Sequence, residues 1–189
     1  MEERYLGELP KNCSCRSEFL AIPSARMWWK IFSLILLALA PARNLLAERE
    51  NEMERTLIIF KPDAVGQGRV GTILARFEGA QLRIAGAKVL RLEEEILREH
   101  YKHLTAEPFF GDIVAYMNST PVLLVVLEGE NAVERVRKMV GPTDSALAPK
   151  GTIRGDFGES KSRNMVHASE DRAAAEEEIG RFFSPAELF

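Results

Sequence analysis

One histidine in this sequence is placed where an imidazole could act as a nucleophile. His167 follows an apolar pair, and an Ala/Glu-rich stretch that predicts a helix begins shortly after it. Ser169 is expected to cap that helix. Glu178 lies nine positions after Ser169, so the helix would carry a carboxylate in its third turn. An imidazole with a carboxylate nearby is typical of nucleophilic and acid–base catalysis.

The segment before this histidine adds positive charge. Residues 150–157 are rich in turn-forming residues and contain Lys150 and Arg154, which could face an anion. An unperturbed imidazole titrates near pH ~6.5, so a neutral nucleophilic nitrogen is present at physiological pH. These residue types together indicate a phosphate site in which His167 is the nucleophile.

Length and charge limit the classes of protein to consider. The 189 residues are enough for one domain with a full hydrophobic core and an additional segment. The net charge of −3 argues against a surface built to coat a nucleic acid. Both cysteines, Cys13 and Cys15, lie near the N-terminus, so residues 53–189 contain neither a disulfide nor a cysteine-based zinc site.

Residues 1–52 differ in character from the rest, and we expect them to be a largely disordered extension of a domain that spans 53–189. Residues 31–40 are apolar with one exception, a run too short to cross a bilayer, which takes ~20 residues. The run fits a signal peptide, with a small-residue cleavage site at 40–42. We favour the alternative that translation starts at Met53, directly before the first predicted strand, and that the upstream residues are not native.

The remaining sequence alternates predicted strands and helices. The order β-α-β, a helical pair and then β-α-β predicts a ferredoxin-like α+β sandwich, βαββαβ, with an inserted helical hairpin. We expect the helices to cover one face of the sheet. A loop before the last strand is too long for a simple connection, and with the hairpin it would frame a cleft beside that strand. The predicted strands are 55–60, 82–92, 122–127 and 165–168, the helices run through 73–77, 93–103, 108–117, 131–140 and 170–182, and the loop is 141–156.

Residues 66–71 match the dinucleotide-binding pattern G-x-G-x-x-G, but their context does not fit it. Five residues, including Pro62, separate the first strand from Gly66, where the pattern needs an immediate turn. No acidic residue stands about 20 positions further on, where a ribose would be bound. The glycines instead predict the entry of a helix.

Five motifs in residues 53–189 occur in the order and at the intervals seen in one known family: Lys61-Pro62-Asp63, Glu99-His100-Tyr101, Pro108-Phe109-Phe110, residues 151–157 and residues 163–167. With these motifs the sequence resembles the nucleoside diphosphate kinase family. The resemblance implies reversible transfer of the γ-phosphoryl of a nucleoside triphosphate to a nucleoside diphosphate, by a ping-pong mechanism through phosphorylated His167. The alternative is a catalytically idle nucleotide-binding or regulatory module of the same fold.

The resemblance also assigns roles to single residues, and the presence of all of them favours the enzyme over the idle module. Glu178 would hold the ring of His167, and the family suggests Nδ1 as the attacking atom. Mg²⁺ would arrive on the nucleotide phosphates without a protein ligand. The protein would be a cytoplasmic homo-oligomer, a tetramer or hexamer, without nucleic-acid or membrane partners for the domain. The phosphate cations would be Lys61, Arg137 and Arg154, the neutral contacts Tyr101, Thr143 and Asn164, and the ring that stacks on a broad range of nucleobases Phe109.

Three further positions carry expectations of their own. His100 and His103 stand at i and i+3 and could hold a metal, but no third ligand is near in the sequence, so we expect a solvated helix end. Ala168 stands where the family usually has glycine, so we expect no left-handed backbone there. The loop at 143–149 lacks a proline common in the family, which bears on subunit contacts more than on catalysis.

Overall fold

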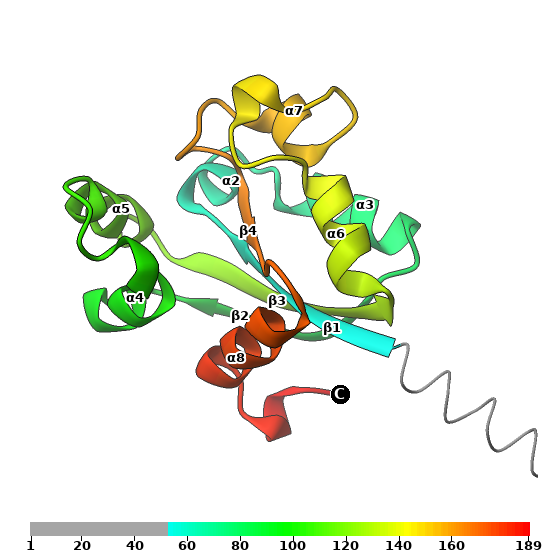
Figure 1. Ribbon diagram of the computed structural model, residues 1–189. Helices are drawn as coiled ribbons and strands as arrows, with labels where there is room; N and C mark the ends of the chain where they lie inside the picture. Colours follow the sequence, from blue (N-terminus) through cyan, green and yellow to red (C-terminus); the bar gives the residue numbers. More distant parts are fainter. Residues whose placement is uncertain (1–52) are drawn as a thin grey trace, which may run out of the picture. The chain divides into compact units, whose positions relative to one another are not determined.

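The computed structural model describes residues 53–189 (Figure 1). Residues 1–52, with the predicted extension and its possible leader, lie outside the described part. No helix in 53–189 has the length and hydropathy needed to cross a membrane. The strands are β1 (Met53–Phe60), β2 (Arg83–Leu90), β3 (Val122–Glu130) and β4 (Val166–Ala168). The helices are α2 (Pro62–Gly66), α3 (Val70–Gly79), α4 (Glu94–His100), α5 (Phe110–Met117), α6 (Ala132–Val140), α7 (Ile153–Phe157) and α8 (Arg172–Phe182), with 3₁₀ turns η1 (Lys102–Leu104), η2 (Ser145–Leu147) and η3 (Pro185–Glu187).

The four strands form one antiparallel sheet in the order β2-β3-β1-β4. The helical pair α4 and α5 is inserted between β2 and β3. This order confirms the predicted ferredoxin-like α+β fold. The edge strand β4 pairs with β1, and His167 lies opposite Ile59 in that register. The histidine is therefore braced against a central strand of the sheet.

Helices cover both faces of the sheet, so the prediction of a single covered face is wrong. Ile58 and Phe60 of β1 pack in one core layer with residues of α3 and α6. Leu57 and Ile59 pack in a second layer with residues of α4, α5 and α8. Figure 1 shows α3 and α6 together on one side of β1, apart from α8. An uninterrupted apolar run such as 57–60 is typical of a strand that is buried on both faces.

The helix ends differ from the sequence-based prediction in their capping residues. Ser169 does not cap α8; Asp171 does, because its Oδ1 accepts a hydrogen bond from Ala174 N at 2.8 Å. Asn131 precedes α6 in a left-handed conformation (φ 48°) and makes no side-chain cap. α5 begins at Phe110, two residues after the predicted start. The long loop contains α7, which Thr152 caps by accepting from Gly155 N at 3.1 Å.

Candidate active site

His167 and Glu178 form the centre of the site. Nε2 of His167 lies 3.1 and 3.0 Å from Oε1 and Oε2 of Glu178, which projects from α8. The side chains are 19% and 13% exposed, respectively. A carboxylate only accepts hydrogen bonds, so this contact places a proton on Nε2 and leaves Nδ1 with its lone pair. The free nitrogen is therefore the one that the resemblance suggests for attack.

Ser169 is the second partner of Glu178, and the sequence analysis assigned it a different role. It is fully buried, and its hydroxyl donates to Oε2 of Glu178 at 2.6 Å. It also accepts a hydrogen bond from Leu57 N at 3.2 Å, which ties it to β1. Residues i and i+2 of an extended chain lie on the same side, so the spacing from His167 could have predicted this contact.

The Glu178 carboxylate is held in its ionised form. Burial alone would raise its pKa, but the hydrogen bonds from His167 and Ser169, with the nearby charges, outweigh burial and lower the pKa. An ionised carboxylate against Nε2–H stabilises positive charge on the imidazole ring. Such charge develops when Nδ1 bonds to an electrophile.

Lys61 and Asn164 form a second cluster beside the start of β4. Nζ of Lys61 donates to Oδ1 of Asn164 at 2.6 Å. The Asn164 amide is buried and donates to the backbone oxygens of Thr143 and Lys161, at 2.8 and 3.0 Å. Burial lowers the pKa of Lys61 to about 8, the charge of Arg154 adds to this effect, and Asp63 opposes it. The cation therefore lies at a site with little compensating negative charge.

Arg154 lies close behind the histidine strand. Its guanidinium donates to the backbone oxygens of Gly141 and Val166, each at 2.9 Å, while its buried Nε has no partner among the described residues. Burial lowers its pKa to about 10, and the charge of Arg137 acts in the same direction. The charge of Arg154 is thus opposed by that of Arg137, and it in turn acts on Lys61. Cations held in this way fit a polyanionic ligand.

The other predicted site residues lie around this centre. The ring centroid of Tyr101 is 6.4 Å from that of His167, and burial raises the pKa of its phenol, which stays protonated at neutral pH. Phe109 precedes α5 and is 48% exposed, so its ring is free to receive a flat ligand. Arg137 is exposed on α6 and lines a hollow of about 680 Å³ with Lys138 and Thr152. Of these residues and Glu178, only Glu178 has a hydrogen bond to His167 in the described part of the chain.

Asp63 positions the chain just before His167, and the sequence analysis gave it no such role. Its buried carboxylate accepts a hydrogen bond from Met165 N at 2.9 Å. Lys61 N donates to Met165 O, also at 2.9 Å. Met165 has the left-handed φ of 70°, which is strained for a non-glycine residue. Ala168 is not among the described residues of positive φ, so the expectation for that position is confirmed.

His100 is not the solvated helix end that was predicted. It is 7% exposed, and its ring lies 4.6 Å from that of His167 at 71°. His103 is exposed, as predicted. The possible ligand atoms of His100, His167 and Glu178 lie within 4.8 Å of one another, a group that does not include His103. However, both Glu178 oxygens accept hydrogen bonds, and Arg181 Nη1 lies 3.3 Å from His100 Nδ1, which favours a hydrogen-bonded cluster over a metal site.

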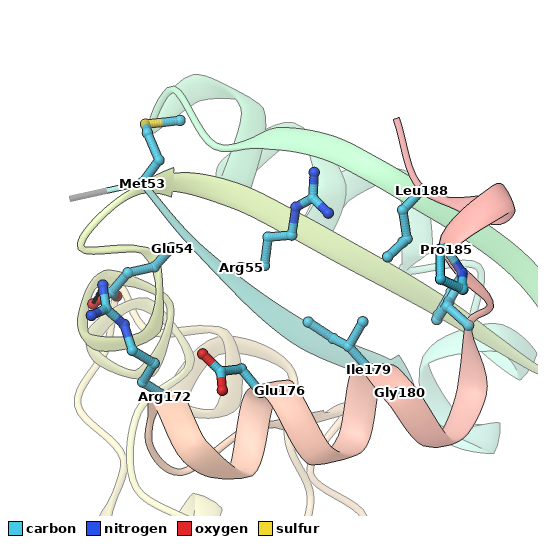
Figure 2. Close-up of a pocket in the computed structure, with 10 residues that line it drawn as sticks. Met53, Glu54, Arg55, Arg172, Glu176, Ile179, Gly180, Pro185 and Leu188 are labelled. Atoms are coloured by element: carbon cyan, nitrogen blue, oxygen red, sulfur yellow. Dashed lines mark ion pairs between the residues drawn. The ribbon is translucent and has the colours of Figure 1, made fainter. Parts of the chain in front are cut away.

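A separate groove of about 630 Å³ lies away from this centre. Its lining comes from the start of β1, one side of α8 and the C-terminal segment, and Figure 2 shows Arg172, Glu176 and Ile179 projecting from α8 into it. Glu178 and His167 are not among its lining residues. The groove is therefore distinct from the histidine site.

A ferredoxin-like domain that holds an imidazole–carboxylate pair beside several poorly compensated cations has the features of an enzyme that acts on phosphate groups. A family model described as nucleoside diphosphate kinase matches residues 54–188. The chain belongs to the nucleoside diphosphate kinase family. It resembles enzymes of that name from Pyrococcus horikoshii, with 49% identity over 74% of this chain and 90% of the relative, and from Gloeobacter violaceus, with 46% identity over 72% and 91%.

Solved structures agree with this assignment. A nucleoside diphosphate kinase from Halobacterium salinarum in complex with CDP superimposes with a TM-score of 0.70 and 42% identity, covering 72% of this chain and 91% of that one. The Aquifex aeolicus enzyme gives a TM-score of 0.69 and 43% identity, covering 72% and 99%. The chain is accordingly an enzyme, a phosphotransferase of the nucleoside diphosphate kinase type.

Proposed function

We propose that His167 carries the phosphoryl group between a nucleoside triphosphate and a nucleoside diphosphate. Nδ1 attacks the γ-phosphorus, the bond to the β,γ-bridging oxygen breaks, and the nucleoside diphosphate leaves with that electron pair. A second diphosphate then attacks the phosphohistidine with its terminal oxygen and regenerates the imidazole. The observation that carries this proposal is the contact of Nε2 with Glu178, which holds the ring and leaves Nδ1 open.

The cations and amides are proposed to bind the phosphate chain. Phosphoryl transfer depends mainly on positioning and on neutralising charge at the transferred group. Lys61, Arg154 and Arg137 supply that charge, and Lys61, with its pKa of about 8, is protonated at pH 7. Tyr101, Thr143 and Asn164 would contact the transferred phosphoryl or the ribose-phosphate part as neutral groups. Thr143 contributes through its side chain, since Asn164 already uses its backbone oxygen.

A divalent metal, proposed to be Mg²⁺, would be held by the nucleotide rather than by the protein. Most of the described groups of this site are cations, amides and hydroxyls, and the carboxylate beside His167, Glu178, has both oxygens in hydrogen bonds. Mg²⁺ prefers oxygen ligands and commonly keeps substrate phosphates among them. Bound there, it would neutralise phosphate charge during transfer.

A broad range of nucleobases is the first expected result. Phe109 offers an exposed ring face, and stacking on a π-face is tolerant of base identity. With ATP as donor, GDP, CDP, UDP and TDP should differ only modestly in kcat/KM, and double-reciprocal plots at several donor concentrations should be parallel lines. A preference above about a thousandfold for one base, on the order of 4 kcal/mol, would contradict the stacking assignment. Intersecting lines would contradict the ping-pong cycle.

Residues 53–189 are proposed to be sufficient for this activity. The family match begins at residue 54, and β1 begins at Met53. A chain starting at Met53 should fold, assemble and turn over substrate as the full chain does, which thermal unfolding and kinetics on both would measure. Loss of activity or assembly in the shorter chain would contradict this proposal. Intact-mass measurement on the native protein would separate a start at Met53 from cleavage after Ala42.

The setting of the enzyme is also a proposal. A nucleotide kinase needs a pool of nucleoside triphosphates, which supports a cytoplasmic location. The resemblance supports a homo-oligomer, a tetramer or hexamer, and light scattering on the full chain would distinguish the two. The family match favours the enzyme over a catalytically idle module of the same fold, and turnover in the nucleotide assay above tests that choice directly.

A further inference from the structure

One buried cation near the site has no part in the mechanism proposed above. Arg181 follows Glu178 on α8 by about one turn, and its side chain is 6% exposed. Its Nε donates to Glu99 at 2.9 Å, and its Nη2 donates to Glu177 at 2.8 Å. Both acids are exposed, and ion pairs with exposed acids stabilise a fold only slightly. These two ion pairs therefore do not explain why the guanidinium is buried, and its third contact, with His100, is the one to consider.

That third contact fixes the chemical state of His100. Arg181 Nη1 lies 3.3 Å from His100 Nδ1. A guanidinium has no lone pair to offer, so Nδ1 must be the acceptor and the proton of the neutral ring must be on Nε2. Burial lowers the pKa of His100 to about 3, the charges of His167, Arg181 and His103 act in the same direction, and Glu178 opposes them.

His100 lies directly against the reacting pair. Its ring is 4.6 Å from the His167 ring, and its Nδ1 is 4.0 Å from Oε1 of Glu178. The rings of Tyr101 and Phe182 enclose it, with centroids at 4.7 and 5.5 Å. The charged and titratable groups around it are Glu178 and Arg181 from α8, His167 from β4, His103 from η1 and the phenol of Tyr101.

A proton on His100 would disturb the site in two ways. The resulting cation would attract the Glu178 carboxylate, so that Glu178 would be shared between His100 and His167. It would also repel the positive charge that develops on the His167 ring during phosphorylation. An interaction that keeps the His100 ring neutral therefore favours phosphoryl transfer to His167.

We propose that Arg181 is a positioning residue for phosphoryl transfer: by donating to Nδ1 of His100 it holds that ring as a neutral support for His167 and reserves Glu178 for the reacting imidazole. This inference rests on the proposed function of His167. It adds an arginine and a second histidine to the residues on which the reaction depends.

The first test is a substitution of Arg181 with a matched control. Arg181→Met keeps the apolar stem and removes the donor, and we expect kcat to fall about tenfold while KM for the diphosphate changes less than about twofold. Arg181→Lys keeps a cationic donor and should recover part of the loss. Lys102→Met removes the other cation that pairs with Glu177, at 3.0 Å, without touching His100, and should leave kcat unchanged. An Arg181→Met enzyme with unaltered kcat would overturn the proposal.

A double-mutant cycle tests whether Arg181 acts through His100. His100→Phe keeps an aromatic ring in the pocket and cannot be protonated. If the proposal holds, Arg181→Met causes little further loss of kcat in the His100→Phe background. Additive losses would mean that Arg181 acts only through Glu99 and Glu177, and the proposal would be wrong.

Nitrogen NMR of the imidazoles in the unaltered full chain gives a readout that needs neither turnover nor a stable variant. His100 should show a single Nε2–H tautomer and no titration between about pH 5 and 8. Titration of His100 within that range would overturn the role of Arg181 even if His167 transfers phosphoryl normally. A chain that fails to transfer phosphoryl, with His100 neutral throughout, would instead refute the function of His167, so the two failures are distinguishable.

Discussion

His167→Ala is expected to abolish phosphoryl transfer, lowering kcat by about four orders of magnitude or more. The reason is that the imidazole supplies the only proposed covalent carrier, so no intermediate can form without it. The fold should persist, because the His167 side chain is partly exposed and the core layers lie elsewhere. ADP should still bind, since Lys61 and Arg154 remain. Steady-state kinetics, thermal unfolding and calorimetric titration with ADP measure these three results.

His103→Ala is the matched control for that substitution. His103 is also a histidine, but it is exposed on η1 and has no proposed contact with substrate. Its removal should leave kcat and KM unchanged. Retained turnover in His167→Ala, with the control equally active, would refute the assignment of the carrier.

Glu178→Gln is expected to have the next largest effect, a fall in kcat of about a hundredfold. The amide oxygen can still accept a hydrogen bond from Nε2, but it offers no negative charge to a ring that becomes positive on phosphorylation. The amide also provides donors where the carboxylate accepts from Ser169 at 2.6 Å. Glu176→Gln removes an exposed carboxylate two residues earlier on the same helix and should leave kcat unchanged. Equal activity of the two variants would contradict the role of Glu178.

The stability of the domain should also depend on Glu178 at acid pH. The pKa of this carboxyl is lower in the folded chain than its ordinary value of 4.5. Its ionised form therefore stabilises the fold at pH above 4.5, and that contribution is lost as the pH falls through the lowered pKa. Denaturant unfolding at a series of pH values should show a smaller acid loss in Glu178→Gln than in the unaltered chain. An identical acid dependence would contradict the lowered pKa.

The sequence predicted the strands and the proximity of His167 and Glu178 well, because those depend on local patterns. Periodic apolar runs gave all four strands to within a few residues, and the short step from β4 to α8 brought His167 and Glu178 together. The covering of both sheet faces was missed, although the uninterrupted run at 57–60 carried that signal.

The contacts that were missed join segments far apart in the chain. Asp63 binds Met165 N across 102 positions, and Arg181 reaches His100 across 81. Periodicity and spacing describe only neighbours along the chain, so they cannot reveal such pairs. The expected role of Ser169 was wrong for a related reason. A hydroxyl before a helix suggests a cap, but the Ser169 hydroxyl donates its hydrogen bond to the Glu178 carboxylate, and Asp171 makes the cap.

The central claim, that this chain works through a phosphohistidine at His167, is tested most directly by isolating the labelled protein. The full chain is incubated with ATP labelled in its γ-phosphoryl and without an acceptor, and the bound label is then tested for acid and alkali stability and mapped to a peptide. We predict label that is lost in acid, retained in alkali, located at His167 and discharged by added GDP. A labelled chain whose phosphate survives acid, or maps to any residue other than His167, or fails to pass to GDP, would contradict the account.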